Sequence, residues 1–166
     1  MDERALTERL ITYDTSNVDG LRAAAGFIKG WLEAREIEVV DHKFGDLHAL
    51  SAVVGPPEGS ERATLVFHGH FDVVPGRPEQ FLPRVEGDRL IGRGAYDMKG
   101  ALASIMCAVR EAAEQDQVRV TFLCVPDEES EDVDNRSTDA LVAEGLRADF
   151  ALTGEPTDLH IGVQAK

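Results

Sequence analysis

The chain has 166 residues, 43% of them hydrophobic, which suffices for one domain with a sizeable core and argues against disorder. Its net charge of −14 at pH 7 excludes nucleic acids and anionic membrane surfaces as favoured partners, because like charges repel. No apolar run reaches the roughly 18 to 20 residues of a membrane span, and the start MDERALTERL lacks the features of a signal peptide. We therefore predict a cytoplasmic protein.

The first half of the chain predicts two helices followed by several strands. Apolar residues recur at helical spacing in 5–11 and again in 21–32, where Asp19 is a possible N-cap. The predicted strands that follow are residues 37–44, 47–54 and 63–67, with a weaker pair around 84–91.

The second half alternates helices and strands. A long helix is predicted from about Asp97 to Glu114, a buried strand at 118–125 and a short helix at 137–146. Two further strands are expected at 149–153 and 159–163. This alternation predicts an α/β fold whose sheet carries its ligand crevice at the carboxyl ends of the strands.

Polar side chains follow three of the predicted strands. These junctions are His68-Gly69-His70-Phe71-Asp72, Pro126-Asp127-Glu128-Glu129 and Gly154-Glu155, while Asp97 opens the long helix. Histidine and carboxylates are ligands that Zn²⁺, Co²⁺ and Mn²⁺ accept, and a carboxylate can bridge two such ions. Each element also has a simpler interpretation: a hydrogen-bonded loop, a helix N-cap at Asp97, a solvated acidic loop or an ordinary turn.

Several of these segments resemble a known enzyme family. His68 to Pro75 resembles the His-x-Asp-Val-Val-Pro segment of zinc-dependent M20 amidohydrolases and peptidases, the family of acetylornithine deacetylase, succinyl-diaminopimelate desuccinylase and carboxypeptidases. Gly92 to Gly100 is similar to the family's Gly-Arg-Gly-x-x-Asp-Met-Lys-Gly segment. Further matches are Asp127-Glu128-Glu129, Gly154-Glu155-Pro156-Thr157 and the opening segment from Leu10 to Asn17.

The resemblance implies a fold and a set of metal ligands. The fold is a three-layer α/β sandwich with a mixed, largely parallel sheet between helices. His70 and Glu155 are implied as ligands of a first zinc ion and Glu129 of a second, with Asp97 bridging the two; Co²⁺ or Mn²⁺ are possible replacements. Asp72 is expected to orient the His70 imidazole.

The implied reaction is hydrolysis of the amide bond of an N-acyl amino acid or a small peptide. Glu128 resembles the general base, which takes a proton from the zinc-bound water and delivers it to the leaving amine. His68 stays an alternative ligand, whereas His42, His48 and His160 are interpreted as surface or packing residues.

The chain also departs from the family pattern. The segment after Glu129 reads SEDVDNRST and lacks the usual glycines, which leaves the conformation of this loop open. Family members continue past a segment like 161–166 into a lid or dimerisation domain and then complete the catalytic domain. The resemblance therefore implies that residues 1–166 are the N-terminal part of the catalytic domain, and that the full-length protein forms a homodimer.

Two alternatives to a hydrolase remain at this point. One is a catalytically inactive metal-binding remnant, or half of a split protein that acts only with a partner chain. The other is an acidic solubility or interaction domain that uses none of these ligands.

Overall fold

The computed structural model describes residues 1–130 and 136–158, and its first two helices are those predicted. Helix α1 (Glu3–Ile11) begins after Asp2, whose side chain accepts a hydrogen bond from the backbone N–H of Ala5. Helix α2 (Val18–Glu33) is capped by Asn17, which accepts from the N–H of Gly20. The predicted cap at Asp19 is wrong, since Asp19 lies inside the first turn, where its charge favours the helix N-terminus.

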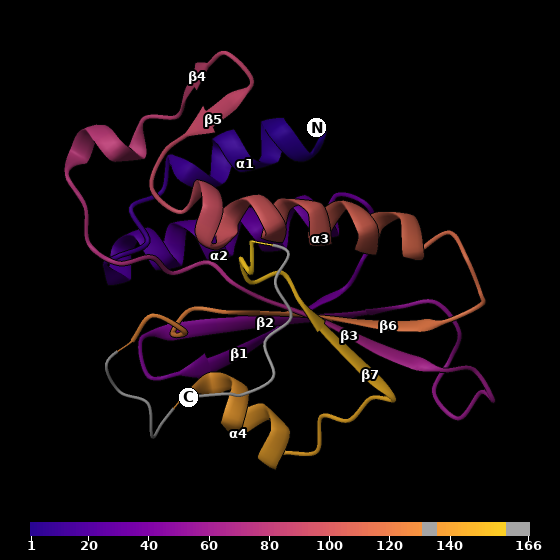
Figure 1. The fold of residues 1–166 in the computed structure, drawn as a ribbon. Coiled ribbons are helices and arrows are strands. Elements are labelled where there is room, and N and C mark those ends of the chain that lie inside the picture. The colour runs from indigo at the N-terminus through magenta and orange to yellow at the C-terminus, as the bar shows by residue number, and fades with distance from the viewer. Residues whose placement is uncertain (131–135, 159–166) are drawn as a thin grey trace.

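Five strands form the central sheet, in the order β1-β2-β6-β3-β7 (Figure 1). Their bounds are β1 (Val39–Phe44), β2 (Leu47–Val54), β3 (Thr64–His70), β6 (Arg119–Val125) and β7 (Phe150–Thr153). Strand β2 is antiparallel to both β1 and β6, whereas β3 is parallel to β6 and to β7. Four of the five strands therefore run in one direction, which confirms the mixed, largely parallel sheet.

The connections between strands contain shorter elements. A 3₁₀ turn η1 (Pro78–Phe81) precedes a small hairpin of β4 (Arg84–Glu86) and β5 (Arg89–Ile91), and an irregular turn η2 (Ala95–Lys99) leads into α3 (Gly100–Ala112). The short helix α4 covers Ser137–Ala143. The predicted strand at 159–163 and His160 lie outside the described residues.

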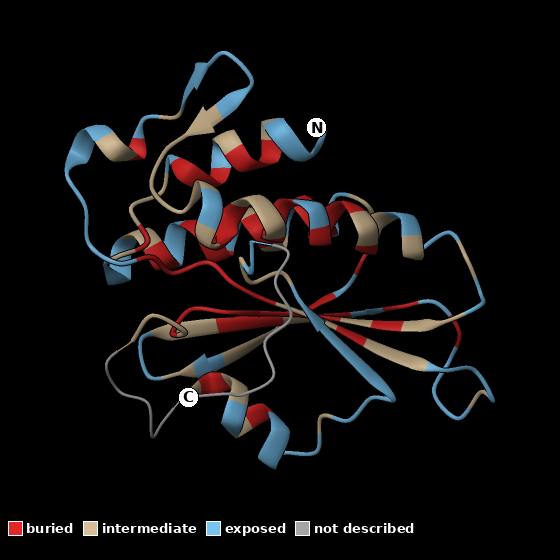
Figure 2. Ribbon diagram, in the orientation of Figure 1, coloured by how far each residue is buried: buried red, intermediate tan, exposed pale blue. Residues whose placement is uncertain are grey.

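Helices cover both faces of the sheet. Helices α1, α2 and α3 lie on one face and α4 on the other (Figure 1). Alternate residues of β6 join different clusters: Phe122 and Cys124 belong to the large core that includes residues of α2 and α3, while Leu123 and Val125 join a smaller cluster with Leu141 of α4. Figure 2 shows buried residues along the sheet and along the helices that cover it. The three-layer arrangement is thus confirmed. In the part of the chain that the structure describes, no helix is long and apolar enough to cross a membrane.

The parallel strands determine where the functional side chains gather. Because β6, β3 and β7 are neighbours that run in one direction, their carboxyl ends meet at one edge. Strand β3 continues three residues further than predicted, so His70 ends the strand instead of following it. The loops after β6 and β7 flank His70 on either side.

Candidate metal centre

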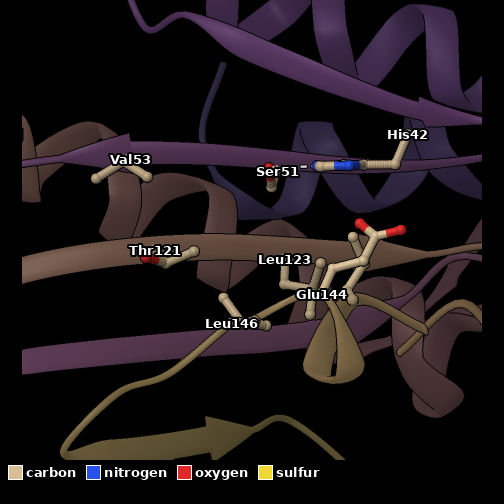
Figure 3. Close-up of a pocket in the computed structure, with 8 residues that line it drawn as sticks. His42, Ser51, Val53, Thr121, Leu123, Glu144 and Leu146 are labelled. Carbon is tan, nitrogen blue, oxygen red and sulfur yellow. Dashed lines mark hydrogen bonds between the residues drawn. The ribbon is translucent and has the colours of Figure 1, made fainter. Parts of the chain in front are cut away.

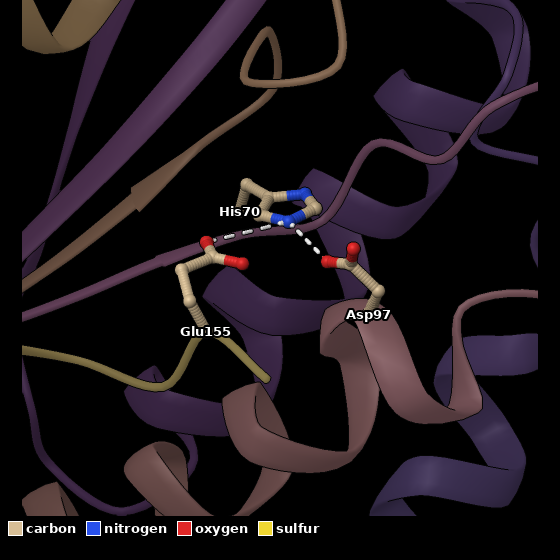
Figure 4. Close-up of side chains that lie close together, drawn as sticks. All are labelled: His70, Asp97 and Glu155. Atoms are coloured by element: carbon tan, nitrogen blue, oxygen red, sulfur yellow. Dashed lines mark hydrogen bonds and ion pairs between the residues drawn. The ribbon is translucent and has the colours of Figure 1, made fainter. Parts of the chain in front are cut away.

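The imidazole of His70 is the centre of the cluster. It is fully buried, and its backbone N–H donates to the sulfur of Met98 at 3.3 Å. Its Nδ1 lies 3.0 Å from the carbonyl oxygen of Asp72 and 3.2 Å from Oδ1 of the same residue. Its Nε2 faces the opposite way, 3.0 Å from Oδ1 of Asp97 and 3.6 Å from Oε1 of Glu155 (Figure 4). Because the neighbours of Nδ1 are hydrogen-bond acceptors, Nδ1 carries the ring proton and donates it. Nε2 is then unprotonated and can bind a metal ion.

Asp97 reaches His70 from the irregular turn before α3. Its φ of −126° and ψ of 104° are not helical, and α3 begins only at Gly100. The predicted helix from Asp97 is therefore too long by one turn, and the simpler interpretation of Asp97 as an N-cap is wrong. The turn starts at Gly94, whose φ of 78° is in the left-handed region that glycine adopts without strain.

Glu155 reaches the cluster from the residues after β7. A Cβ on Gly154 would lie 2.6 Å from Cβ of Ala101 on α3, so glycine is required for this close approach. The hydroxyl of Tyr96 also donates to Oδ1 of Asp158 at 2.5 Å, which links the segment after β7 to the turn that carries Asp97. Tight backbone packing thus brings Glu155 toward His70.

Glu128 and Glu129 follow β6 on the other side of His70. Oδ2 of Asp72 accepts from the backbone N–H of Glu129 at 2.7 Å, so one carboxylate contacts both the imidazole of His70 and this loop. Asp127 is buried and accepts from the backbone N–H and the hydroxyl of Ser137, both at 2.7 Å. The loop is therefore attached to β3 and to the start of α4.

Two overlapping groups of side chains offer ligand atoms within 4.8 Å of one another: His70 with Asp97 and Glu155, and His70 with Glu128 and Glu129. The structure thus brings together the side chains that the sequence singled out as metal ligands. It also brings Glu128 into reach, so the distinction between a base at Glu128 and a ligand at Glu129 stays a prediction from the resemblance.

The electrostatics of the cluster favour a cation. Burial lowers the pKa of His70, but the carboxylates of Asp72, Glu155 and Asp97 outweigh it and raise this pKa to about 9. Burial raises the pKa of Glu129 and Glu155, and the neighbouring carboxylate of Asp97 adds to both shifts. One imidazole nitrogen among crowded carboxylates is a donor set that suits a divalent metal ion, which would neutralise their mutual repulsion.

The other three histidines that the structure describes lie outside the two ligand groups. His68 Nε2 is 3.1 Å from the hydroxyl of Thr138 on α4, and among the described residues His68 belongs to neither ligand group. His48 pairs with Asp41. His42 Nε2 lies 2.8 Å from the hydroxyl of Ser51, in a hollow between the sheet and α4 that is lined by apolar and polar side chains in equal number (Figure 3).

Sequence reasoning missed several residues that support the cluster. The attachment of Asp127 to Ser137 joins positions ten residues apart, and no motif signalled it. Lys99 is fully buried, and its Nζ donates to the carbonyl of Tyr13 at 2.9 Å; burial lowers its pKa to about 7, although Asp14 and Asp72 oppose this. A lysine directly before the largely apolar run of residues 100–109 was the available signal for such a role.

Comparison with protein families gives one match over most of the site. The profile of peptidase family M20/M25/M40 matches residues 66–166. The succinyl-diaminopimelate desuccinylase of Paracidovorax citrulli is 41% identical over 129 residues, which are 71% of this chain and 33% of that protein. The N-acetyl-L-citrulline deacetylase of Xanthomonas campestris is 36% identical over 158 residues, 90% of this chain and 40% of that protein.

Solved structures agree on the fold. An M20 family metallo-carboxypeptidase from Sulfolobus solfataricus matches with a TM-score of 0.76 and 23% identity, over 93% of this chain and 37% of its own. Human carnosine dipeptidase 1 matches with a TM-score of 0.70 and 20% identity, over 91% of this chain and 37% of its own. The chain thus spans about a third to two fifths of the length of the proteins it matches.

Proposed function

The chain belongs to peptidase family M20/M25/M40, and from this premise we propose that it supplies the metal-binding part of a hydrolase that cleaves the amide bond of N-acyl amino acids. The observation that supports this proposal best is the position of His70. Asp72 holds its Nδ1, and its Nε2 faces the carboxylates of Asp97 and Glu155. This is the arrangement that a metal-ligating histidine requires.

The chain's membership of the family and the ligand atoms in the cluster both support binding of a divalent metal ion. We propose that this ion is zinc. His70 and Glu155 would hold one ion, Glu129 a second, and Asp97 both; Co²⁺ or Mn²⁺ would suit the same donors. When bound, the metal supplies Lewis acidity, which polarises the substrate carbonyl and makes water more acidic.

The protein side chains would position the substrate and move protons. Glu128 would take a proton from the attacking water and deliver it to the leaving amine, so that the products are a carboxylate and a free amine. Asp72 would keep His70 in one tautomer and fix the loop of Glu129 through its 2.7 Å hydrogen bond. Glu128 is 38% exposed, which leaves it accessible to water and substrate.

The names of the relatives guide the proposed substrate class. Two relatives are named as enzymes that remove succinyl or acetyl groups, whereas structural matches include a carboxypeptidase and a dipeptidase. The relatives with the higher sequence identity favour an N-acyl amino acid over a peptide. We further propose that residues 1–166 form the N-terminal part of the catalytic domain of a homodimeric enzyme.

The test measures zinc content and hydrolysis of N-succinyl and N-acetyl amino acids and of dipeptides by the full-length protein. We expect His70→Ala and Asp97→Ala to lose bound zinc, while His42→Ala, remote from the cluster, serves as the control. Full zinc occupancy in both site variants would refute the ligand assignment. Zinc binding by the wild type without turnover of any substrate would favour the non-catalytic alternative.

A further inference from the structure

The loop that carries Glu128 has an unexpected neighbour in Arg136, which stands in the segment that departs from the family's glycine-rich pattern. Nη1 of Arg136 lies 3.2 Å from Oε1 of Glu128, and Nη2 donates to the carbonyl of Ser130 at 3.5 Å. The guanidinium thus joins the side chain of Glu128 to the backbone two residues further on.

Arg136 is itself held in place by the residue that follows it. Ser137 is fully buried and donates to both carboxylate oxygens of Asp127, which is 6% exposed. Hydrogen bonds of 2.7 Å to a buried carboxylate are strong, so the backbone at Arg136 has a fixed position relative to Glu128. A side chain attached to such a fixed backbone can hold its partner in one orientation.

The surroundings explain why Glu128 needs a cationic partner. It lies beside Glu129 and within ligand distance of His70, in a cluster that also contains Asp97 and Glu155. Repulsion from these carboxylates would turn an unpaired Glu128 toward solvent, since glutamate has three rotatable side-chain bonds. Arg136 binds only Oε1, and among the described residues Oε2 of Glu128 has no hydrogen-bond partner.

We propose that Arg136 is a positioning residue that holds the carboxylate of Glu128 at the metal cluster with one oxygen free to accept a proton. This inference rests on the proposed function, because it assigns Arg136 a role in keeping the general base oriented. The ion pair is partly exposed, at 29% for Arg136 and 38% for Glu128, so its contribution to folding is small. The main effect of the ion pair is to orient the side chain of Glu128.

The kinetic test compares Arg136→Met and Arg136→Lys with the wild type in the zinc-loaded, full-length protein. We expect Arg136→Met to lower kcat about tenfold or more with little change in KM or zinc content, because misorientation of a base slows proton transfer. Arg136→Lys should recover part of the rate. The control is Arg110→Met, which removes an ion pair of the same 3.2 Å length on α3, where the arginine is exposed to a similar degree, 34% against 29% for Arg136.

Three kinetic results would overturn the inference: an unchanged or higher kcat in Arg136→Met, a fall explained by lost zinc, or a lysine variant no faster than the methionine variant. A second measurement does not depend on turnover. In protein labelled with ¹³C at glutamate carboxyl groups, the Glu128 signal, identified by its loss in Glu128→Gln, should shift in Arg136→Met and not in Arg110→Met. An unshifted signal refutes the pairing, whereas a shifted signal in an inactive wild type refutes only the proposed function.

Discussion

Replacing Asp72 by alanine tests how the metal cluster is held together. The carboxylate of Asp72 lies 3.2 Å from Nδ1 of His70 and accepts from the N–H of Glu129 at 2.7 Å, so the change removes a support from two ligands at once. Loss of one such supporting contact lowers metal affinity about 10- to 100-fold. At about 1.4 kcal/mol per tenfold change, this corresponds to about 1.4–2.8 kcal/mol of binding free energy. We expect the upper half of that range, because both ligands are affected.

The assay is titration of the 166-residue chain with zinc against a chromophoric chelator of known affinity. Asp41→Ala is the matched control, since Asp41 contacts Nδ1 of His48 at 2.8 Å in a histidine–aspartate pair outside the cluster. The backbone carbonyl of Asp72 also lies 3.0 Å from Nδ1 of His70 and remains in the variant. If that carbonyl alone orients the ring, zinc affinity will stay within about twofold of wild type, and the role assigned to the carboxylate is refuted.

Three further predictions concern the same cluster. Glu128→Ala in the full-length protein should abolish turnover while zinc content stays near wild type, and an unchanged kcat would contradict its assignment as the base. Gly154→Ala should lower zinc affinity, because its Cβ would clash with α3 and displace the following glutamate; Gly30→Ala, at an open helical position, should leave affinity unchanged. Ser137→Ala should lower the free energy of unfolding by about 1–3 kcal/mol in urea titrations, since it leaves an oxygen of the buried Asp127 carboxylate unpaired, and an unmoved midpoint would argue against that bond.

Local patterns were sufficient to predict the α/β sheet and the polar strand ends that form the cluster, whereas the assignment of individual ligands came from the family resemblance. The continuous apolar run before Asp127 is typical of a strand buried on both faces, and it forms β6 at the predicted position. Polar residues at the ends of parallel strands meet at one edge of a sheet, which is why His70 and Glu155 lie together although 85 positions separate them.

Local patterns were insufficient where tertiary contacts determine the backbone. The sequence around Asp97 has helical character, yet packing at the cluster holds Asp97 in an extended conformation and α3 starts three residues later. The bond between Asp127 and Ser137 and the pairing of Glu128 with Arg136 depend on how a loop folds back on itself. Such contacts between distant positions leave no periodicity in a sequence.

Strand β7, which leads to Glu155, is more exposed than the strands that lead to the other residues of the cluster. Among the described residues it is bonded only to β3, and its four residues are exposed, whereas no residue of β3 or β6 is exposed. A metal ion bound by both His70 and Glu155 would link the segment after this exposed strand to the buried end of β3. Occupancy of the cluster and order of this strand are then thermodynamically coupled, so saturation at about 100 times the dissociation constant would stabilise β7 by up to about 2.7 kcal/mol. Amide hydrogen exchange in Phe150–Thr153 would therefore slow when the cluster binds metal, and its rate would measure how far the cluster is occupied.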